Sequence, residues 1–184
     1  MKSKLKLTFA HPNQLEQAFE RYYPAIFRYF RYRGADADTA DYLASSVFER
    51  ALANLQTYDS HKSQTQTWLF TIARNLSINY RKTETIHPTA SLNDLELLAL
   101  DDPPSEENLI LVQDKRDILQ ALQTLDPLSI EIIALKFGGY LTNHQIAELT
   151  HLSTNNVRVM LYRSLLKLRV ILETRQVEVN HGRK

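Results

Sequence analysis

The chain has 184 residues, with 22 Lys and Arg against 21 Asp and Glu, and it contains no cysteine. The lack of cysteine excludes a disulfide scaffold and every thiolate metal site, and it agrees with a cytoplasmic location. No stretch approaches the roughly 20 apolar residues that cross a bilayer, and residues 1–14 lack the apolar core of a signal peptide, so we expect no membrane insertion. Taken as an average, the net charge of +1 argues against nucleic acid as a partner.

The first 83 residues carry the spacing of three amphipathic helices. Only four glycines and six prolines interrupt the chain, which favours long helices over a turn-rich β fold. Apolar residues recur every three or four positions from residue 13 to residue 33, which predicts a helix that Gly34 ends and that Pro24 kinks or divides. The same spacing recurs from Leu43 to Leu55 and from Leu69 to Tyr80.

The composition changes abruptly after these helices. Residues 84–107 contain seven acids, no Lys or Arg, and three prolines, which is typical of a linker. We therefore predict a flexible acidic linker over residues 84–106, between a helical domain over residues 10–83 and a second one over residues 107–176. The predicted fold class is all-α, with two small helical domains, the second of which contains a helix-turn-helix.

The second domain contains clear helix starts and stops. Apolar residues at positions 118, 119, 122 and 125 end one helix, and Asp126 followed by Pro127 predicts the start of the next. The glycines at 138 and 139 should end that helix. Thr142 and Gln145 then have the spacing of a capping box, which opens a helix of about seven residues.

Ser153 is the predicted cap of the last helix, which completes a helix-turn-helix pattern. In that arrangement the second helix lies in the DNA major groove. We expect one face of this helix to pack inward through Val157, Leu161, Leu165 and Leu168. The opposite face carries amide and cationic groups that suit base edges and phosphates, namely Asn155, Asn156, Arg158, Tyr162, Arg163 and Lys167. An ordinary pair of packed helices is the structural alternative.

A second cluster of cations, amides and aromatic residues lies within residues 68–82. It comprises Trp68, Phe70, Arg74, Asn75, Asn79, Tyr80, Arg81 and Lys82. This combination suits unstacked, single-stranded bases. The alternative interpretation makes Trp68 a core residue and leaves Asn75 and Asn79 merely solvated.

We predict no catalytic residue, no metal site and no cofactor. Asp36, Asp38 and Asp41 have the spacing of a calcium loop, but the loop's glycine and its final glutamate are missing. His144 and His151 lack a third ligand at useful spacing. The sequence contains no glycine-rich phosphate loop, nucleophile elbow or paired catalytic carboxylates, so an enzyme is not expected.

Five segments occur in an order that resembles a bacterial sigma factor of the extracytoplasmic-function type, or group 4. The segments are LEQAFERYYPAIFRYFRYRGAD, YLASSVFERAL, WLFTIARNLSINYRK, LDPLSIEIIALKF and HQIAELTHLSTNNVRVMLYRSLLKL. The resemblance extends over residues 15–172. It implies a protein that gives RNA polymerase promoter specificity and assists melting of the −10 element, by flipping a base without catalysis. It also implies that the acidic linker runs along the polymerase, and that an anti-sigma factor regulates the chain.

The resemblance assigns three groups of site residues. The clamp helices of the largest polymerase subunit would contact Asp41, Ser45, Ser46 and Glu49, in the segment 41–50. The single-stranded −10 element would contact Lys62, Arg74, Asn75, Asn79, Arg81 and Lys82, together with a loop over residues 59–67. The −35 element would be read by residues 153–167, which adds Ser153 and Thr154 to the polar face described above.

Several positions depart from the family pattern. Tyr42, Ser45 and Ser46 stand where the family usually has an acid, a glutamine and an acid, and Thr65 stands in place of an aromatic residue. Met160 replaces a common arginine and His151 replaces the turn glycine. The departures at Tyr42, Ser45 and Ser46 keep open the hypothesis of a helix-turn-helix regulator that binds duplex DNA without polymerase. A helical adaptor for protein partners only is a third hypothesis.

The net charge of +1 hides an uneven distribution. Residues 62–82 carry four cations and no acid, and residues 158–175 carry five cations and one acid. The acidic linker cancels both. The two basic segments coincide with the two predicted DNA-contacting surfaces, so the average charge is no argument against nucleic acid.

Overall fold

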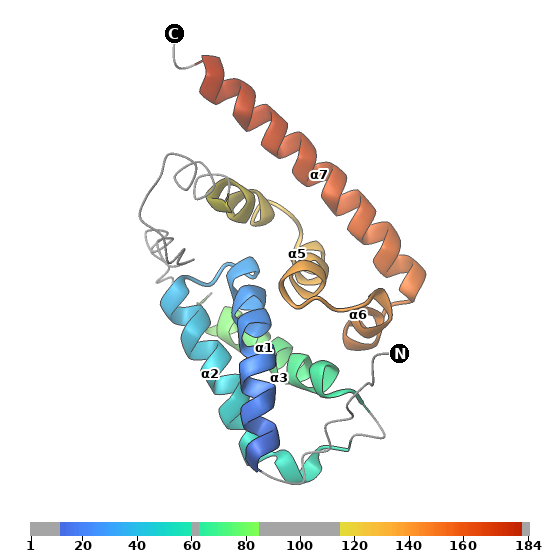
Figure 1. Cartoon of the computed structure of the whole chain (residues 1–184). Coiled ribbons are helices and arrows are strands. Elements are labelled where there is room, and N and C mark those ends of the chain that lie inside the picture. The colour runs from blue at the N-terminus through green and yellow to red at the C-terminus, as the bar shows by residue number, and fades with distance from the viewer. Residues whose placement is uncertain (1–11, 60–62, 85–114, 182–184) are drawn as a thin grey trace, which may run out of the picture.

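The computed structural model describes residues 12–59, 63–84 and 115–181 (Figure 1). Every regular element in these ranges is a helix. The all-α fold class predicted from the sequence is therefore confirmed. Almost all of the predicted linker, and Lys62, lie outside the described residues.

The first half contains the three predicted helices, α1 (Pro12–Tyr32), α2 (Ala37–Ala53) and α3 (Thr65–Glu84), with a short 3-10 turn, η1 (Leu55–Thr57), after α2. Pro24 does not divide α1, which is continuous through it. Proline removes one backbone hydrogen bond, and the buried residues Ala25 and Ile26 directly after it hold the helix against its neighbours. Gly34 ends α1 with a φ of 96°, a conformation that glycine adopts at low cost.

The second half begins with a helical segment over residues 115–122 and continues with α5 (Pro127–Ile133), η2 (Ala134–Gly138), α6 (Asn143–Thr150) and α7 (Thr154–His181). The three predicted caps are confirmed. The Asp126 carboxylate accepts from the Ser129 amide at 2.9 Å, and the Ser153 hydroxyl accepts from the Asn156 amide at 3.1 Å. Thr142 and Gln145 form the reciprocal capping box.

Two details of the second half differ from the sequence predictions. The helix that starts at Pro127 does not stay α-helical to Gly138, because its last turn is the π-helical η2, in which the Gly139 amide donates to the Ala134 carbonyl at 3.0 Å. Leu165 does not pack inward and is 43% exposed, whereas Ser164 is only 3% exposed. Ser164 follows Val157 by seven residues, which is nearer to two full helical turns than the eight residues to Leu165.

One hydrophobic core runs through both halves. Helix α1 packs against α2 and also against η2, and α3 contacts α6 (Figure 1). Two adjacent glycines permit this close approach. A Cβ atom on Gly138 would lie 2.9 Å from the Tyr29 backbone, and one on Gly139 would lie 2.7 Å from the Phe70 ring. The predicted domains are therefore packed together through apolar residues in this structure.

Candidate nucleic-acid interface

The N-terminal half of α7 presents a polar face to solvent. Asn155, Arg158 and Tyr162 follow one another at helical spacing, and all the predicted −35 residues are exposed, namely Ser153, Thr154, Asn155, Asn156, Arg158, Tyr162, Arg163 and Lys167. The opposite face holds α7 in place through Val157, Leu161 and Leu168, which are buried. We call this exposed set the α7 face.

The turn between α6 and α7 fixes the direction in which the α7 face points. His151 adopts a left-handed conformation with a φ of 58°. This is the position at which the family pattern has a turn glycine. The Leu152 amide then donates to the Ala147 carbonyl at 3.1 Å, so the chain turns within the few residues before α7 starts.

The cations of the α7 face keep their charge available. Among the described side chains, Arg158 and Arg163 form no ion pair. The cation that is paired, Arg169, lies further along the helix, where its Nε is 2.7 Å from Glu173 in a solvent-exposed pair. The hydrogen bond from Arg169 to Glu173 raises the pKa of the arginine. The α7 face is therefore positive where it is most exposed.

The predicted −10 residues on α3 are arranged differently. Asn75, Asn79 and Lys82 are exposed. Arg74 and Arg81 instead face other parts of the protein. The Arg74 Nε lies 3.7 Å from the Glu131 carboxylate, and Arg81 donates to the Arg33 carbonyl at 2.6 Å.

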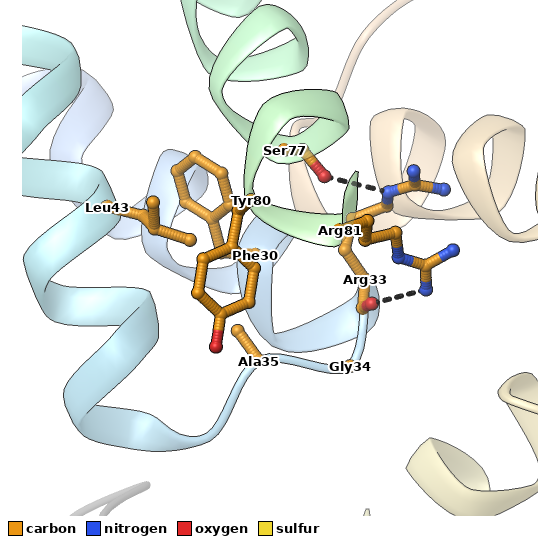
Figure 2. A pocket seen from close by; sticks show the side chains of 8 residues that line it. All are labelled: Phe30, Arg33, Gly34, Ala35, Leu43, Ser77, Tyr80 and Arg81. Atoms are coloured by element: carbon orange, nitrogen blue, oxygen red, sulfur yellow. Dashed lines mark hydrogen bonds between the residues drawn. The ribbon is translucent and has the colours of Figure 1, made fainter. Parts of the chain in front are cut away.

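Figure 2 shows the surroundings of Arg81. Arg33 and Arg81 extend their guanidinium groups to the same side, away from Leu43 and Tyr80, and Arg33 donates to the Ser77 hydroxyl at 3.1 Å. The small cavity between them has a volume of about 20 Å³. This is room for roughly one water molecule, so the cavity is too small for a nucleobase.

The predicted −10 loop is shorter than the sequence suggested. Thr65, Gln66 and Thr67 belong to the first turn of α3, and both threonines are buried. Thr65 shares a hydrogen bond of 3.1 Å with the Tyr58 hydroxyl, and the Tyr58 ring packs against Trp68 with their centroids 4.6 Å apart. Trp68 is thus half-buried against the core, as the structural alternative predicted.

The predicted polymerase-binding residues lie along one side of α2. Asp41, Ser45 and Glu49 are four residues apart and share a face, with Ser46 beside them. Asp41 and Glu49 are exposed, whereas the two serines are half-buried. The Tyr23 hydroxyl on α1 donates to the Asp41 carboxylate, so α1 holds one end of this face in position.

The sequence predictions missed a buried polar cluster between the two halves. The Glu131 carboxylate on α5 accepts from the Tyr29 hydroxyl at 2.9 Å and pairs with the Arg33 guanidinium at 3.1 Å. Burial, and after it the Glu131 charge, raise the pKa of Tyr29 well above 10, so the phenol stays protonated and donates. The available signal was one carboxylate inside the apolar run of residues 130–135.

Comparison with known proteins agrees with this architecture. Residues 18–85 match the family model of Sigma-70 region 2, and residues 115–168 match that of Sigma-70, region 4. The RNA polymerase sigma factor YlaC of Bacillus subtilis is 28% identical over 162 residues, which cover 86% of this chain and 92% of that protein. The ECF RNA polymerase sigma factor BldN of Streptomyces coelicolor is 25% identical over 155 residues, which cover 84% of this chain and 58% of that longer protein.

A solved structure shares the fold. It is the complex of the sigma factor RpoE with the anti-sigma factor NepR from Bartonella quintana, and its match has a TM-score of 0.66 at 20% identity. The match covers 86% of this chain and 96% of that one.

A helix-turn-helix whose second helix exposes a basic face is typical of DNA-binding proteins. The two matched family regions together span more than half of the chain, in the order in which sigma factors carry them. The chain belongs to the sigma-70 family, in its extracytoplasmic-function branch, and is a sigma factor. Members of this family are non-catalytic factors of transcription initiation. Among the described residues, no helix is both long enough and apolar enough to cross a membrane.

Proposed function

We propose that this sigma factor divides promoter recognition between its two halves. The α7 face reads the −35 element as duplex DNA. Residues on α3 bind the −10 element as a single strand, and the α2 face that contains Asp41 and Glu49 binds the clamp helices of the largest polymerase subunit. The domain boundaries follow this division, with residues 10–83 as the first domain, 84–106 as the linker and 107–176 as the second domain.

The exposure of the α7 face is the observation that carries this proposal. Amide groups lie near the start of the helix and cations lie further along it, on a face that no other described element covers. Asn can pair with adenine, Arg can pair with guanine, and Lys and Arg neutralise phosphates on either side. Apolar packing through Val157 on the opposite face fixes the orientation of α7, and with it the positions of these groups.

The α2 face supports the polymerase contact in chemical terms. Two exposed carboxylates and two hydroxyl groups suit a partner helix that supplies arginine or amide donors. Tyr42, in place of the usual acid, is 69% exposed and adds an aromatic contact to the same side. An anti-sigma factor is a further expected partner, because a structure with the same fold holds one. We further propose that the chain acts in the cytoplasm and has no enzymatic activity of its own.

Run-off transcription tests the proposal. Purified core polymerase is combined with the chain on fragments of its own genome, and we expect initiation at a small set of promoters that core polymerase alone does not use. A matched reaction contains the Arg158→Ala variant, which should lose initiation at −35-dependent promoters. If no promoter responds to the unaltered chain, the proposal is wrong. Co-purification of core polymerase then separates a polymerase partner from an independent DNA-binding regulator.

A further inference from the structure

In the described part of the first half, three large hydrophobic side chains are exposed, and all of them lie on α1 or α2. Phe19 on α1 is 41% exposed, and Tyr42 and Leu52 on α2 are 69% and 57% exposed. The large hydrophobic side chains of α3 are buried or half-buried. Aromatic residues are enriched where proteins contact one another. The apolar surface that the first half offers to a partner is therefore on α1 and α2, and not on α3.

Phe19 and Tyr23 border the α2 face that is assigned to polymerase. The two helices pack along each other (Figure 1), and the Phe19 ring meets the Phe48 ring of α2 with their centroids 4.8 Å apart. The Tyr23 ring follows one turn further along α1, 4.7 Å from the Phe19 ring. Phe48 is only 6% exposed, so it fixes both rings at the junction of the two helices, while much of Phe19 stays in solvent. We call Phe19 and Tyr23 the α1 edge.

The Tyr23 hydroxyl group bonds to residues of the α2 face. It donates a hydrogen bond to the Asp41 carboxylate, and a hydrogen bond also joins it to the Ser45 hydroxyl. Burial, and after it the bond to Asp41, raise the pKa of Tyr23, so the phenol is protonated at neutral pH and donates. An ionised carboxylate has about four acceptor sites on its two oxygens. The bond from Tyr23 therefore fixes the direction of Asp41 and leaves it able to accept from a partner.

Apolar and polar groups share one side of α2. At about 100° per residue, Tyr42 and Leu52 fall within the same roughly 140° arc of the helix as the residues assigned to polymerase, which are Asp41, Ser45, Ser46 and Glu49. The α1 edge lies at the margin of this arc, beside Asp41 and Ser45. Tyr42 and Ser46 replace two acids of the family pattern, so this side offers less charge and more apolar surface to its partner.

We propose that the polymerase-binding surface extends from α2 onto the α1 edge, where Phe19 packs against apolar side chains of the clamp helices and Tyr23 positions the Asp41 carboxylate for their donors. This inference rests on the proposed assignment of the α2 face to those helices. The partner surface then has apolar side chains beside arginine or amide donors, which complement the exposed Phe19 ring and the Asp41 charge. Tyr23 is a positioning residue, because it acts through Asp41, whereas Phe19 contacts the partner itself.

The affinity of the full-length chain for purified core polymerase tests this extension. Core polymerase is immobilised, and biolayer interferometry gives the dissociation constant of each variant. Phe19→Ala should weaken binding about fivefold or more, as loss of an aromatic side chain from the centre of an interface does. Tyr23→Phe removes only a hydroxyl group and should weaken binding about threefold to tenfold. Tyr22→Phe is the matched control and should leave the affinity unchanged, because it removes the same group from the neighbouring tyrosine, whose ring lies against Arg21 of α1 itself.

Two further measurements separate a positioning role from a general loss of structure. Asp41→Asn removes the charge that Tyr23 positions, so Tyr23→Phe should cost little more affinity in a chain that already carries Asp41→Asn. The loss in Asp41→Asn should shrink as salt rises, because ions screen an exposed charge, whereas the loss in Phe19→Ala should not. Thermal unfolding reports the stability of each variant. Tyr23→Phe keeps the ring and its packing, so it tests the inference even if Phe19→Ala lowers the stability of the first half.

The outcomes separate the inference from the assignment on which it rests. Glu49→Gln is added for this purpose, because Glu49 belongs to the same face about two turns away from Asp41. If the α2 substitutions weaken core binding and the two α1 substitutions do not, the inference is wrong and the α2 assignment stands. Equal losses from Tyr23→Phe with and without Asp41→Asn would overturn the positioning role. If Asp41→Asn and Glu49→Gln both leave core affinity unchanged, the α2 assignment itself is wrong, and the inference falls with it.

Discussion

The two proposed DNA-contacting surfaces differ in how much of their positive charge is accessible to DNA. The α7 face is exposed along its whole length, and its arginines have no ion-pair partner among the described side chains. On α3, by contrast, Arg74 and Arg81 are occupied by Glu131, Arg33 and Gln123. Both segments are basic in sequence. The difference shows that two segments of similar basic charge can expose different amounts of that charge once the chain has folded.

The largest effect is expected from a substitution in the buried ion pair between Arg33 and Glu131, next to the α3 surface. Removal of one partner from a buried ion pair costs about 3 to 5 kcal/mol. Without Arg33, the Glu131 carboxylate keeps only the longer 3.7 Å contact with Arg74 and the hydrogen bond from Tyr29, so the lower end of this range applies. We expect Arg33→Met to destabilise the packing of the two halves against each other by this order, so that the halves separate. Small-angle X-ray scattering should then record a larger radius of gyration for the full-length chain.

The control for this prediction removes both charges. In the double variant, Arg33→Met with Glu131→Leu, both charges of the closest pair are removed, and apolar replacement of a whole buried pair is often neutral or stabilising. The Tyr29 hydroxyl and Arg74 lose Glu131 as a partner, so we expect the double variant to be more compact than the single variant but not more compact than the parent. If Arg33→Met alone stays as compact as the parent, the ion pair does not hold the two halves together. The pairing of the α3 arginines would then need another explanation.

The exposed surface should respond to truncation of a side chain that reads bases. Arg158→Ala should weaken binding to the duplex −35 element by about 1 to 3 kcal/mol and relax the preference at one base pair. Titrations of duplexes that carry each base at each position would measure this change. Lys167→Ala is the comparison, and it should weaken all duplexes alike and reduce the salt dependence by about one unit of slope. An unchanged preference in Arg158→Ala would remove that residue from the reading set.

A smaller effect is expected at the N-terminal cap of α5. Hydrogen bonds from Ser129, first from its side chain and then from its backbone, lower the pKa of Asp126, which caps α5. Because the folded pKa lies below the unfolded one, the contribution is present above the usual carboxyl pKa and is lost as pH falls through the lowered value. Asp126→Ala should therefore cost about 1 kcal/mol at neutral pH, and urea unfolding should show this difference vanish in strong acid.

The smallest effect is expected at the turn that directs the α7 face. His151 occupies a left-handed conformation, which strains residues with a Cβ atom. His151→Gly should stabilise the chain by about 0.5 to 1 kcal/mol without altering duplex affinity, since the turn geometry is already the one that glycine prefers. Thermal unfolding and duplex titration check the two parts. A loss of stability would mean that the imidazole makes a contribution larger than the strain.

Local chemistry made much of the second half predictable. The caps at Asp126, Thr142 and Ser153 depend on residues at most three positions away, and all three form as the sequence indicated. The Leu165 prediction was wrong because neighbouring positions on a helix differ by only about 100° in direction, and a small serine was not recognised as an inward residue.

The buried cluster could not be predicted in the same way. Tyr29 and Glu131 are separated by 102 positions in the chain, and no local rule brings them together. Glu131 is a visible anomaly inside an apolar run, but the sequence does not say which cation or hydroxyl group meets it. The need for glycine at position 138 could not be predicted either. Glycine is required there because the Tyr29 backbone lies too close for a Cβ atom, and not because of a turn at Gly138 itself.

The sequence by itself determined the all-α class, the caps of the second half and the order of segments that marks the family. These features follow from periodicity and from hydrogen bonds between near neighbours, which the order of residues specifies directly. Only the tertiary structure decided which charges of α3 face the second half. Pairing across a long sequence separation depends on how whole helices pack, and packing is decided by the summed shape and burial of many side chains.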